Sequence, residues 1–256
     1  MSERVIRRIG VVTALAAAVA ASGCAGGRQH GVAGADKTLV KRCAAGAVRP
    51  VGSANVAWAA VVERPLTAFR SPGRAPIARF GLLNVNGVPT VLGVLGERVN
   101  ASCRATWLHV ALPLRPNGIT GWVRARNVQR ASVRTRITVD LSERRVRLYR
   151  NGKLVLTSRA AVGSSATPTP LGRYYVNQRL VPSDASGPFG PGAVGISAFS
   201  PVLTGWAQGG PIAIHGTNEP WSIGRAVSNG CIRLPNPVLR RLFKQALAGT
   251  PVLIRR

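Results

Sequence analysis

Two of the four Asn-Gly dipeptides in this chain constrain its fold more than any other feature of its sequence. Asn86-Gly87 follows a short apolar run at 82–85, and Asn151-Gly152 lies between the segments 145–149 and 154–156. Asn-Gly favours the type I′ turn that joins two antiparallel strands. Apolar and basic or aromatic side chains alternate over 145–149, as is typical of a half-buried strand. The sequence therefore predicts a mainly β chain with hairpins in two separate regions.

Composition excludes two classes of protein. The chain has 256 residues, of which 46% are hydrophobic and 17% are charged. This apolar content is too high for a disordered chain and suffices for one large domain or two modest ones. A polytopic membrane protein would contain several apolar runs of about 20 residues, and the sequence has none.

The first residues resemble an export signal. Arg4, Arg7 and Arg8 precede an uncharged, mostly apolar stretch at 9–21, which is short for a membrane span. The stretch ends in Ala21-Ser22-Gly23-Cys24, which resembles a bacterial lipobox with Ala21 in place of the usual Leu. We therefore expect a signal peptide over 1–23 and an acylated Cys24 that anchors the chain to a membrane. The alternative is an ordinary cleaved signal with Cys24 as a bystander.

Export would limit the binding partners that the chain can meet and would favour disulfide bonds between its cysteines. The net charge of +27 suits anionic wall polymers or lipid headgroups, and an exported chain does not meet nucleic acid. An oxidising compartment favours disulfides. Once Cys24 is assigned to the anchor and Cys231 to the motif described below, a Cys43–Cys103 disulfide remains as the simplest pairing. The alternative is two buried free thiols.

The region before residue 130 divides into a linker and a small β module. Residues 24–55 are rich in Gly, Ala and polar residues without periodicity, which predicts a linker. Within 56–130, Trp107–Val110 and Gly121–Val123 flank a turn, and this pair resembles the late strands of bacterial SH3-like modules. Such modules bind cell-wall peptide or dock on a catalytic domain. His109 alternates with apolar neighbours, so we expect a surface or structural role for it.

Residues 134–256 predict a second β-rich domain with one C-terminal helix. Asn236-Pro237 predicts the helix start, with Asn236 as N-cap, and Gly249 predicts the end of the helical segment. Residues 182–210 are rich in Gly, Pro and Ser and predict a long irregular loop. The expected strands are centred on 137–141, 145–149, 154–156, 173–176, 211–214 and 252–254.

Two elements of this domain can carry nucleophilic chemistry. His215 ends a predicted strand, and Cys231 lies in the segment 228–234. A thiol attacks as the thiolate, which a nearby imidazole can generate. Gly230 permits a tight turn that would aim backbone N–H groups at a developing oxyanion. In an extended segment Arg233 would share a face with Cys231, where it could bind a substrate carboxylate.

The orienting group for the imidazole is left open by the residues themselves. Glu219 is the only acid between His215 and Cys231, and it lies in a predicted loop. A backbone carbonyl is the alternative. Three His and no Cys-x-x-Cys motif give too few ligands for a zinc site, so we predict no metal and no cofactor.

Taken in order, these motifs resemble the L,D-transpeptidase catalytic family, also called YkuD-like. The resemblance includes His215-Gly216-Thr217, the later Ser228-x-Gly230-Cys231-Ile232-Arg233-Leu234, and Pro168–Gly172 upstream. It implies a β-rich catalytic domain acting on peptidoglycan, with Cys231 as nucleophile and His215 as general base. The remaining implied site residues are Gly216, whose carbonyl orients the imidazole, and the substrate or oxyanion group Ser228, Asn229, Gly230 and Arg233. Asn229 stands where many members have His, which affects substrate contacts.

The resemblance also implies a reaction and its rivals. Cys231 would attack the third residue of a tetrapeptide stem and expel D-Ala, and an amine of a second stem would resolve the thioester. Carbapenem-type β-lactams would acylate the same thiol. We therefore expect a lipid-anchored enzyme of the cell envelope. An L,D-carboxypeptidase on the same stems and a non-catalytic wall-binding lipoprotein are the alternatives.

Overall fold

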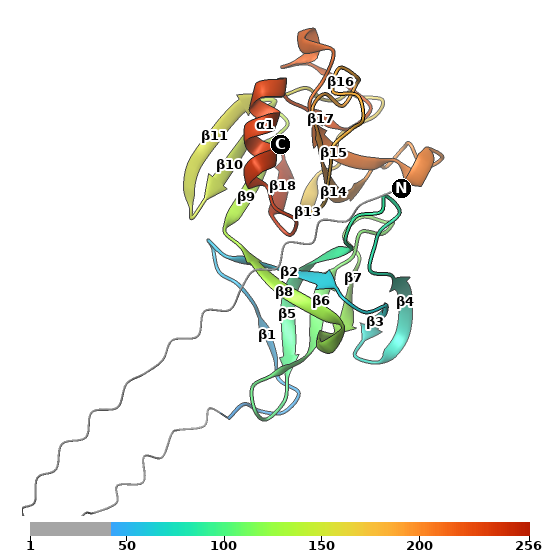
Figure 1. Cartoon of the computed structure of the whole chain (residues 1–256), viewed down its shortest axis with the longest axis vertical. Coiled ribbons are helices and arrows are strands. Elements are labelled where there is room, and N and C mark those ends of the chain that lie inside the picture. Colours follow the sequence, from blue (N-terminus) through green and yellow to red (C-terminus); the bar gives the residue numbers. More distant parts are fainter. Residues whose placement is uncertain (1–41) are drawn as a thin grey trace, which may run out of the picture. The chain divides into compact units, whose positions relative to one another are not determined.

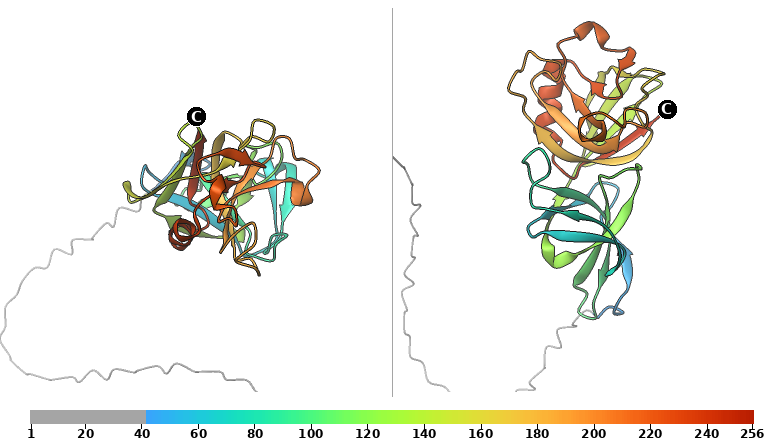
Figure 2. Two further views of the ribbon diagram at one scale, coloured as in Figure 1. Left: turned by 90° about the horizontal axis from the view of Figure 1, so that it is seen from above. Right: turned by 90° about the vertical axis from the view of Figure 1, so that its right-hand side faces the viewer.

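The computed structural model describes residues 42–256, which form two β-rich bodies that we call the N-terminal module and the C-terminal domain (Figures 1 and 2). The predicted signal peptide at 1–23, the acylation of Cys24 and most of the linker lie outside the described residues. The mainly β class with one α-helix is confirmed. In the described part of the chain, no helix has the length and apolar character needed to cross a bilayer.

The N-terminal module is built on one eight-stranded sheet. Its main path runs in the order β4-β3-β7-β6-β5-β2-β8, and β1 pairs with β5 beside that path. The strands are β1 (Val48–Pro50), β2 (Ala57–Val62), β3 (Leu66–Ser71), β4 (Arg74–Phe80), β5 (Val91–Val99), β6 (Ala105–Ala111), β7 (Thr120–Arg124) and β8 (Val128–Val133), with the short 3₁₀ helix η1 (Ala125–Asn127) before β8.

Alternating apolar residues of this sheet form the module's core. The Trp107–Val110 and Gly121–Val123 segments lie in β6 and β7, where Leu108 pairs with Val123 and both are fully buried. The Asn86-Gly87 turn is present, but the flanking segments form only an isolated bridge between Leu83 and Pro89. The predicted hairpin is therefore a tight turn between β4 and β5, because the apolar run before it is exposed rather than packed in the core.

The module begins earlier than the sequence predicted. β1 lies within the expected linker 24–55 and pairs antiparallel with β5. Arg49 of β1 and Arg130 of β8 both donate to the buried carboxylate of Glu97, at 2.7 Å each. Cys43 and Cys103 form the expected disulfide, with an S–S distance of 2.09 Å. The composition of this segment did not reveal the strand because β1 is short and depends on these tertiary contacts.

The C-terminal domain is built on a second eight-stranded sheet, in the order β11-β10-β9-β18-β13-β14-β15-β17. β18 is parallel to β9, β15 is parallel to β17, and the other neighbours in this order are antiparallel. The strands are β9 (Thr135–Asp140), β10 (Arg145–Arg150), β11 (Lys153–Arg159), β13 (Gly172–Leu180), β14 (Ala193–Phe199), β15 (Pro211–His215), β17 (Ile232–Arg233) and β18 (Pro251–Arg255), and a separate parallel pair joins β12 (Val162–Gly163) to β16 (Ala226–Ser228).

The predicted loop over 182–210 is wrong in its central part. β14 occupies Ala193–Phe199 and lies between β13 and β15. Six of its residues are buried, so the strand shows no alternation of apolar with polar side chains. Gly and Pro in the flanking segments, together with the small residues of the strand, concealed it in the sequence. The strand matters to the site because it pairs with β15, which carries His215.

The single helix packs on the C-terminal sheet (Figure 1). α1 spans Asn236–Gln245, and its Leu239 and Leu242 are fully buried in the domain core. The predicted N-cap is wrong by one position, because Pro235 is the cap and Asn236 is the first helical residue. The Asn236 side chain is engaged elsewhere: its Oδ1 accepts a hydrogen bond from the backbone N–H of Thr217 at 2.8 Å. The helix start therefore holds the segment that follows His215.

Candidate active site

A cavity of about 540 Å³ brings the predicted catalytic residues together. His215, Cys231 and Arg233 all line it, as do Ser228 and Asn229. β15 supplies His215 at its last residue, and the turn between β16 and β17 supplies Cys231. Because β15 and β17 pair in parallel, with His215 opposite Arg233, the two motifs meet at one edge of the sheet.

The imidazole of His215 is buried and held in one tautomer. Its Nδ1 lies 2.5 Å from the carbonyl oxygen of Gly216, which can only accept a hydrogen bond. Nδ1 therefore carries the proton, and Nε2 keeps a free lone pair. Burial lowers the pKa of the imidazole to about 4, against a smaller opposing effect of the Gly216 carbonyl, and the positive charge of Arg233 lowers it further. The ring of Phe189 contacts the imidazole edge-on, with centroids 5.0 Å apart.

Cys231 is the free cysteine of the described residues. Burial raises the pKa of its thiol, while a hydrogen bond from the Ala213 backbone N–H and the charge of Arg233 act in the opposite direction. The Sγ atom also lies 3.9 Å from the carbonyl oxygen of Pro211. Since the thiol pKa is raised and the His215 pKa is lowered, the resting pair near neutral pH is a neutral thiol and a neutral imidazole.

Hydroxyl groups fix the backbone around Cys231. Ser228 Oγ donates to the Cys231 carbonyl at 2.5 Å and accepts from the Gly230 N–H at 3.2 Å. Thr169 Oγ1, in the upstream Pro168–Gly172 motif, donates to the Gly230 carbonyl at 2.8 Å. Gly230 has a φ of +105°, a conformation that side chains with a Cβ rarely adopt. The Gly230 N–H is thus engaged by Ser228 rather than directed at the cavity.

Gly216 is required at its position by close packing. A Cβ on this residue would lie 2.3 Å from Asn236 Oδ1 and 2.7 Å from Pro191 Cδ. The space around Gly216 is therefore filled by the side chain that also binds the Thr217 N–H. Any larger residue would displace the carbonyl that fixes the tautomer of His215.

Arg233 is paired within the chain. Its Nη1 donates to a carboxylate oxygen of Glu219, and its buried Nε has no hydrogen-bond partner among the described residues. Glu219 therefore contacts Arg233 and not the imidazole. Of the two alternatives that the sequence left open, the Gly216 carbonyl is therefore the one that contacts the imidazole.

Sequence reasoning missed several residues of the cavity wall. Phe189, Gln178, Trp206 and Gln208 line the cavity, as does Asn86 from the N-terminal module. Asn86 was recognised only as a turn residue. No spacing or motif connects these positions, because tertiary folding alone brings them together.

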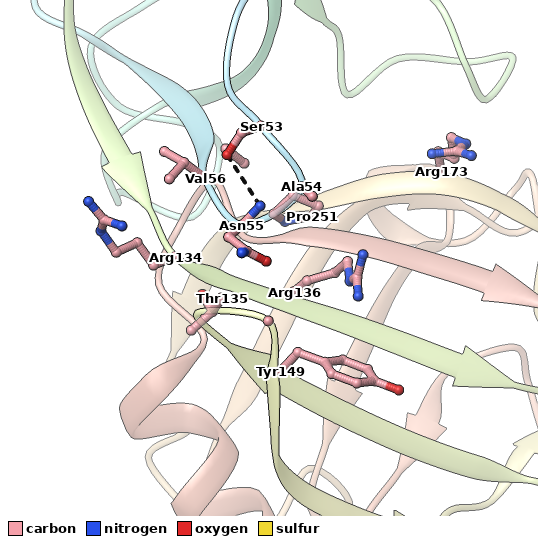
Figure 3. Close-up of a pocket in the computed structure, with 12 residues that line it drawn as sticks. Ser53, Ala54, Asn55, Val56, Arg134, Thr135, Arg136, Tyr149, Arg173 and Pro251 are labelled. Carbon is pink, nitrogen blue, oxygen red and sulfur yellow. Dashed lines mark hydrogen bonds between the residues drawn. The ribbon is translucent and has the colours of Figure 1, made fainter.

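A second cavity, of about 250 Å³, contains none of the predicted catalytic residues (Figure 3). It is lined by residues 53–57 of the module and by Arg134, Arg136 and Arg173. Arg136 lies over the ring of Tyr149, 5.0 Å from its centroid. Within residues 42–256, no group of three or more His, Cys, Asp or Glu side chains is placed to hold a metal ion.

The part of the chain that carries His215 and Cys231 matches a family model over slightly less than half of the chain. Residues 134–254 match the model of YkuD, the L,D-transpeptidase catalytic domain. The resemblance of the motifs is thereby confirmed for this region, which we now call the YkuD-like domain. The match leaves the N-terminal module unassigned.

Two Bacillus proteins named as candidate L,D-transpeptidases, both called YkuD, are similar to the same region. The protein of Bacillus licheniformis is 40% identical over 119 residues, which are 46% of this chain and 64% of the relative. The protein of Bacillus subtilis is 37% identical over 120 residues, which are 47% of this chain and 65% of the relative. The chain therefore spans a little under two thirds of the length of these relatives.

Solved structures of L,D-transpeptidases also match. The NMR structure of the catalytic domain from the Enterococcus faecium enzyme is 27% identical and covers 47% of this chain and 96% of that one, with a TM-score of 0.36. The same domain acylated by ertapenem is 28% identical, with the same coverages and a TM-score of 0.35. The family match consequently rests on the sequence of the YkuD-like domain.

Proposed function

We propose that this chain is an exported peptidoglycan L,D-transpeptidase in which Cys231 is the nucleophile and His215 the general base. The observation that carries the proposal is the contact between His215 Nδ1 and the Gly216 carbonyl. This contact leaves Nε2 unprotonated in the cavity that also contains the Cys231 thiol. The match of residues 134–254 to the L,D-transpeptidase catalytic domain supports the choice of substrate.

The first half-reaction forms a thioester. His215 Nε2 takes the proton of the Cys231 thiol while Sγ attacks the carbonyl carbon of the third residue of the donor stem. The tetrahedral intermediate then breaks its C–N bond to D-Ala, and the imidazolium gives its proton to the departing amine. Because the resting pair is neutral, proton transfer accompanies attack, and no preformed thiolate is needed.

The second half-reaction returns the enzyme to its starting state. The side-chain amine of an acceptor stem attacks the thioester carbonyl, and His215 accepts a proton from that amine. The C–S bond breaks, and the Cys231 thiolate regains its proton from the imidazolium. If water replaces the amine, the same steps release a tripeptide and the enzyme is an L,D-carboxypeptidase.

In this proposal the remaining site residues position the nucleophile and the base or contact the substrate. Ser228 and Gly230 shape the turn that carries Cys231, and Gly216 fixes the tautomer of His215. Asn229 lines the cavity and would contact substrate. Arg233 lowers the pKa of both catalytic groups through its charge, and Glu219 offsets that charge.

Incubation with a tetrapeptide stem, with and without an acceptor stem, should distinguish transfer to an amine from hydrolysis by water. The wild-type protein should release D-Ala from a tetrapeptide stem and, with an acceptor stem present, form a cross-linked product measurable by mass spectrometry. Cys231→Ala is the control and should do neither. D-Ala release without a cross-linked product would indicate a carboxypeptidase. Absence of both would favour the non-catalytic wall-binding protein.

We further propose that Cys24 is acylated, that the residues between Cys24 and the N-terminal module link the module to the anchor, and that the module is SH3-like. Small residues at 21–23 and the basic start of the chain support export to the cell envelope. Cys24→Ala should move the protein from the membrane to the soluble fraction of cells that process lipoproteins. Unchanged membrane retention, or a mature N-terminus mapped elsewhere, would contradict acylation.

A further inference from the structure

One wall of the active-site cavity includes a residue from the N-terminal module. Asn86, in the turn between β4 and β5, lines the cavity together with Gln178 of β13 and Gln208 of the YkuD-like domain. Asn86 and Gln208 exchange hydrogen bonds through their carboxamides: Gln208 Nε2 donates to Asn86 Oδ1 at 2.8 Å, and Asn86 Nδ2 donates to Gln208 Oε1 at 3.4 Å. The module therefore contributes to the cavity as well as adjoining it.

The carboxamide of Gln178 is oriented by two residues of the module. Its Oε1 accepts hydrogen bonds from Asn84 Nδ2 and Asn86 Nδ2, at 2.9 Å each. Since both hydrogen bonds end on Oε1, the NH₂ group of the same carboxamide, at Nε2, points away from Asn84 and Asn86. It lies beside Gly195, another cavity-lining residue, where an added Cβ would come within 2.9 Å of Nε2. Gln178 Nε2 has no hydrogen-bond acceptor among the described residues.

The local backbone prepares this arrangement. A bulge between Val176 and Gln178 interrupts the pairing of β13 with β14, and bulges redirect the side chain that they carry. Asn84 is fixed by its own turn, because its Oδ1 accepts the backbone N–H of Asn86 at 2.9 Å. The unpaired donor of Gln178 is thus the end of a chain of contacts that starts in the module.

Further contacts fix the loop that closes this wall. Arg115 Nη2 donates to the Ser200 carbonyl at 2.7 Å, and its Nε donates to the Gly209 carbonyl at 3.0 Å. Asn117 exchanges two hydrogen bonds with the backbone of Phe199, at 2.8 and 2.9 Å. The loop between Phe199 and Pro211 carries Trp206 and Gln208 of the cavity wall.

The charge and polarity of the residues that line the cavity indicate which kind of ligand it binds. Arg233 is the charged residue of the cavity lining, and its guanidinium is paired with Glu219. The rest of the lining is uncharged and combines carboxamide, aromatic, aliphatic and glycine residues. A largely uncharged wall with one free side-chain N–H donor fits the backbone of a peptide, whose carbonyls are unpaired acceptors when it is extended.

We propose that Gln178 donates a hydrogen bond to a backbone carbonyl of the bound peptide, and that Asn84 and Asn86 are positioning residues that aim this donor. The proposal rests on the proposed function in taking a stem peptide as the ligand. It makes the module a determinant of substrate affinity, in addition to any wall binding of its own.

Asn84→Asp tests the proposal with little change of shape. The Asp carboxylate keeps the acceptor for the Asn86 N–H, loses the donor to Gln178 Oε1, and attracts Gln178 Nε2 away from the cavity. We expect Kd for a tetrapeptide stem to rise about tenfold, the effect of losing one well-placed hydrogen bond. Isothermal titration calorimetry in a Cys231→Ala background measures binding without turnover. In the active enzyme KM should rise similarly while kcat stays within about twofold.

Two comparisons separate positioning from a general structural effect. Asn100→Asp is the matched control, because Asn100 Oδ1 also accepts a backbone N–H within the module, from Arg104 at 2.9 Å. It adds the same charge at a side chain that has no contact with Gln178, and it should leave Kd unchanged. Gln178→Ala should raise Kd as much as Asn84→Asp does, and the double variant no further, because the Asn acts through the Gln.

The binding measurements test the role of Gln178 whether or not the protein catalyses the proposed reaction. Unchanged Kd in Asn84→Asp or Gln178→Ala, additive effects in the double variant, or absence of saturable peptide binding to the Cys231→Ala protein would overturn it. Failure of the wild-type enzyme to release D-Ala would instead refute the proposed function, while the binding measurements would still test the role of Gln178.

Discussion

Incubation with a carbapenem adds one acyl group to each chain, on Cys231, if the proposed nucleophile is right. The strained amide carbonyl of the β-lactam is open to attack by a thiol, and ring opening releases the strain. Intact-protein mass spectrometry should show a single mass increase, and peptide mapping should place it on Cys231. Cys43 and Cys103 should remain unlabelled because they are joined in a disulfide.

Cys231→Ser is the corresponding variant. A hydroxyl has a much higher pKa than a thiol, so the neutral His215 cannot activate it comparably, and the adduct should be lost. A thiol titration of the unfolded wild-type protein provides the control that Cys231 was reduced before treatment. Labelling of Cys231→Ser at the wild-type rate, or no adduct on folded protein with a free Cys231, would rule out the assignment.

Removal of the His215 imidazole lowers the rates of acylation and D-Ala release by about 10²- to 10⁴-fold, the range typical of general base catalysis. The pH profile gives a sharper test. The pKa of His215 is lowered to about 4, so the neutral base is present above that pH and is lost as pH falls through it. The wild-type rate should therefore decline on the acid side near pH 4, and His215→Ala should lack this decline.

The residual rate of the variant provides a second signature. Burial raises the pKa of the Cys231 thiol, so His215→Ala should gain activity as pH rises and the thiolate forms without a base. His109→Ala is the control, since it removes a half-buried imidazole of the module that does not line the cavity. Near-wild-type turnover by a folded His215→Ala protein would contradict the assignment of the base.

The sequence predicted the elements whose side chains carry local signals. The strand at 145–149 alternates, the segment 252–254 is an apolar run, and Asn151-Gly152 has the conformation that only a few residues favour. The candidate catalytic pair was also recognisable, because His215 and Cys231 lie in motifs whose residues and spacing resemble those of one family. Their common cavity confirms that the two motifs lie together.

The missed features depend on tertiary contacts. β14 is buried along almost its whole length, so its side chains do not alternate between apolar and polar. Asn236 has the residue type of an N-cap, yet it binds the Thr217 N–H instead, because the packing around Gly216 brings it there. The ion pair of Glu219 with Arg233 and the contact of Asn84 with Gln178 join distant elements of the chain. No local propensity distinguishes such partners from other surface residues.

The place of β18 in the sheet determines when the YkuD-like domain can complete its fold. β18 lies between β9 and β13, where Val252 pairs with Ile137 and also with Tyr174. β9, the first strand of the YkuD-like domain, therefore has no pairing partner on one side until residues 251–255 form β18. If the chain is exported unfolded, as the proposed signal peptide implies, it cannot complete the sheet that supports the cavity while residues 251–255 remain in the channel. His215 and Cys231 would then reach a common cavity only after these residues emerge, and the proposed transfer activity would begin outside the channel.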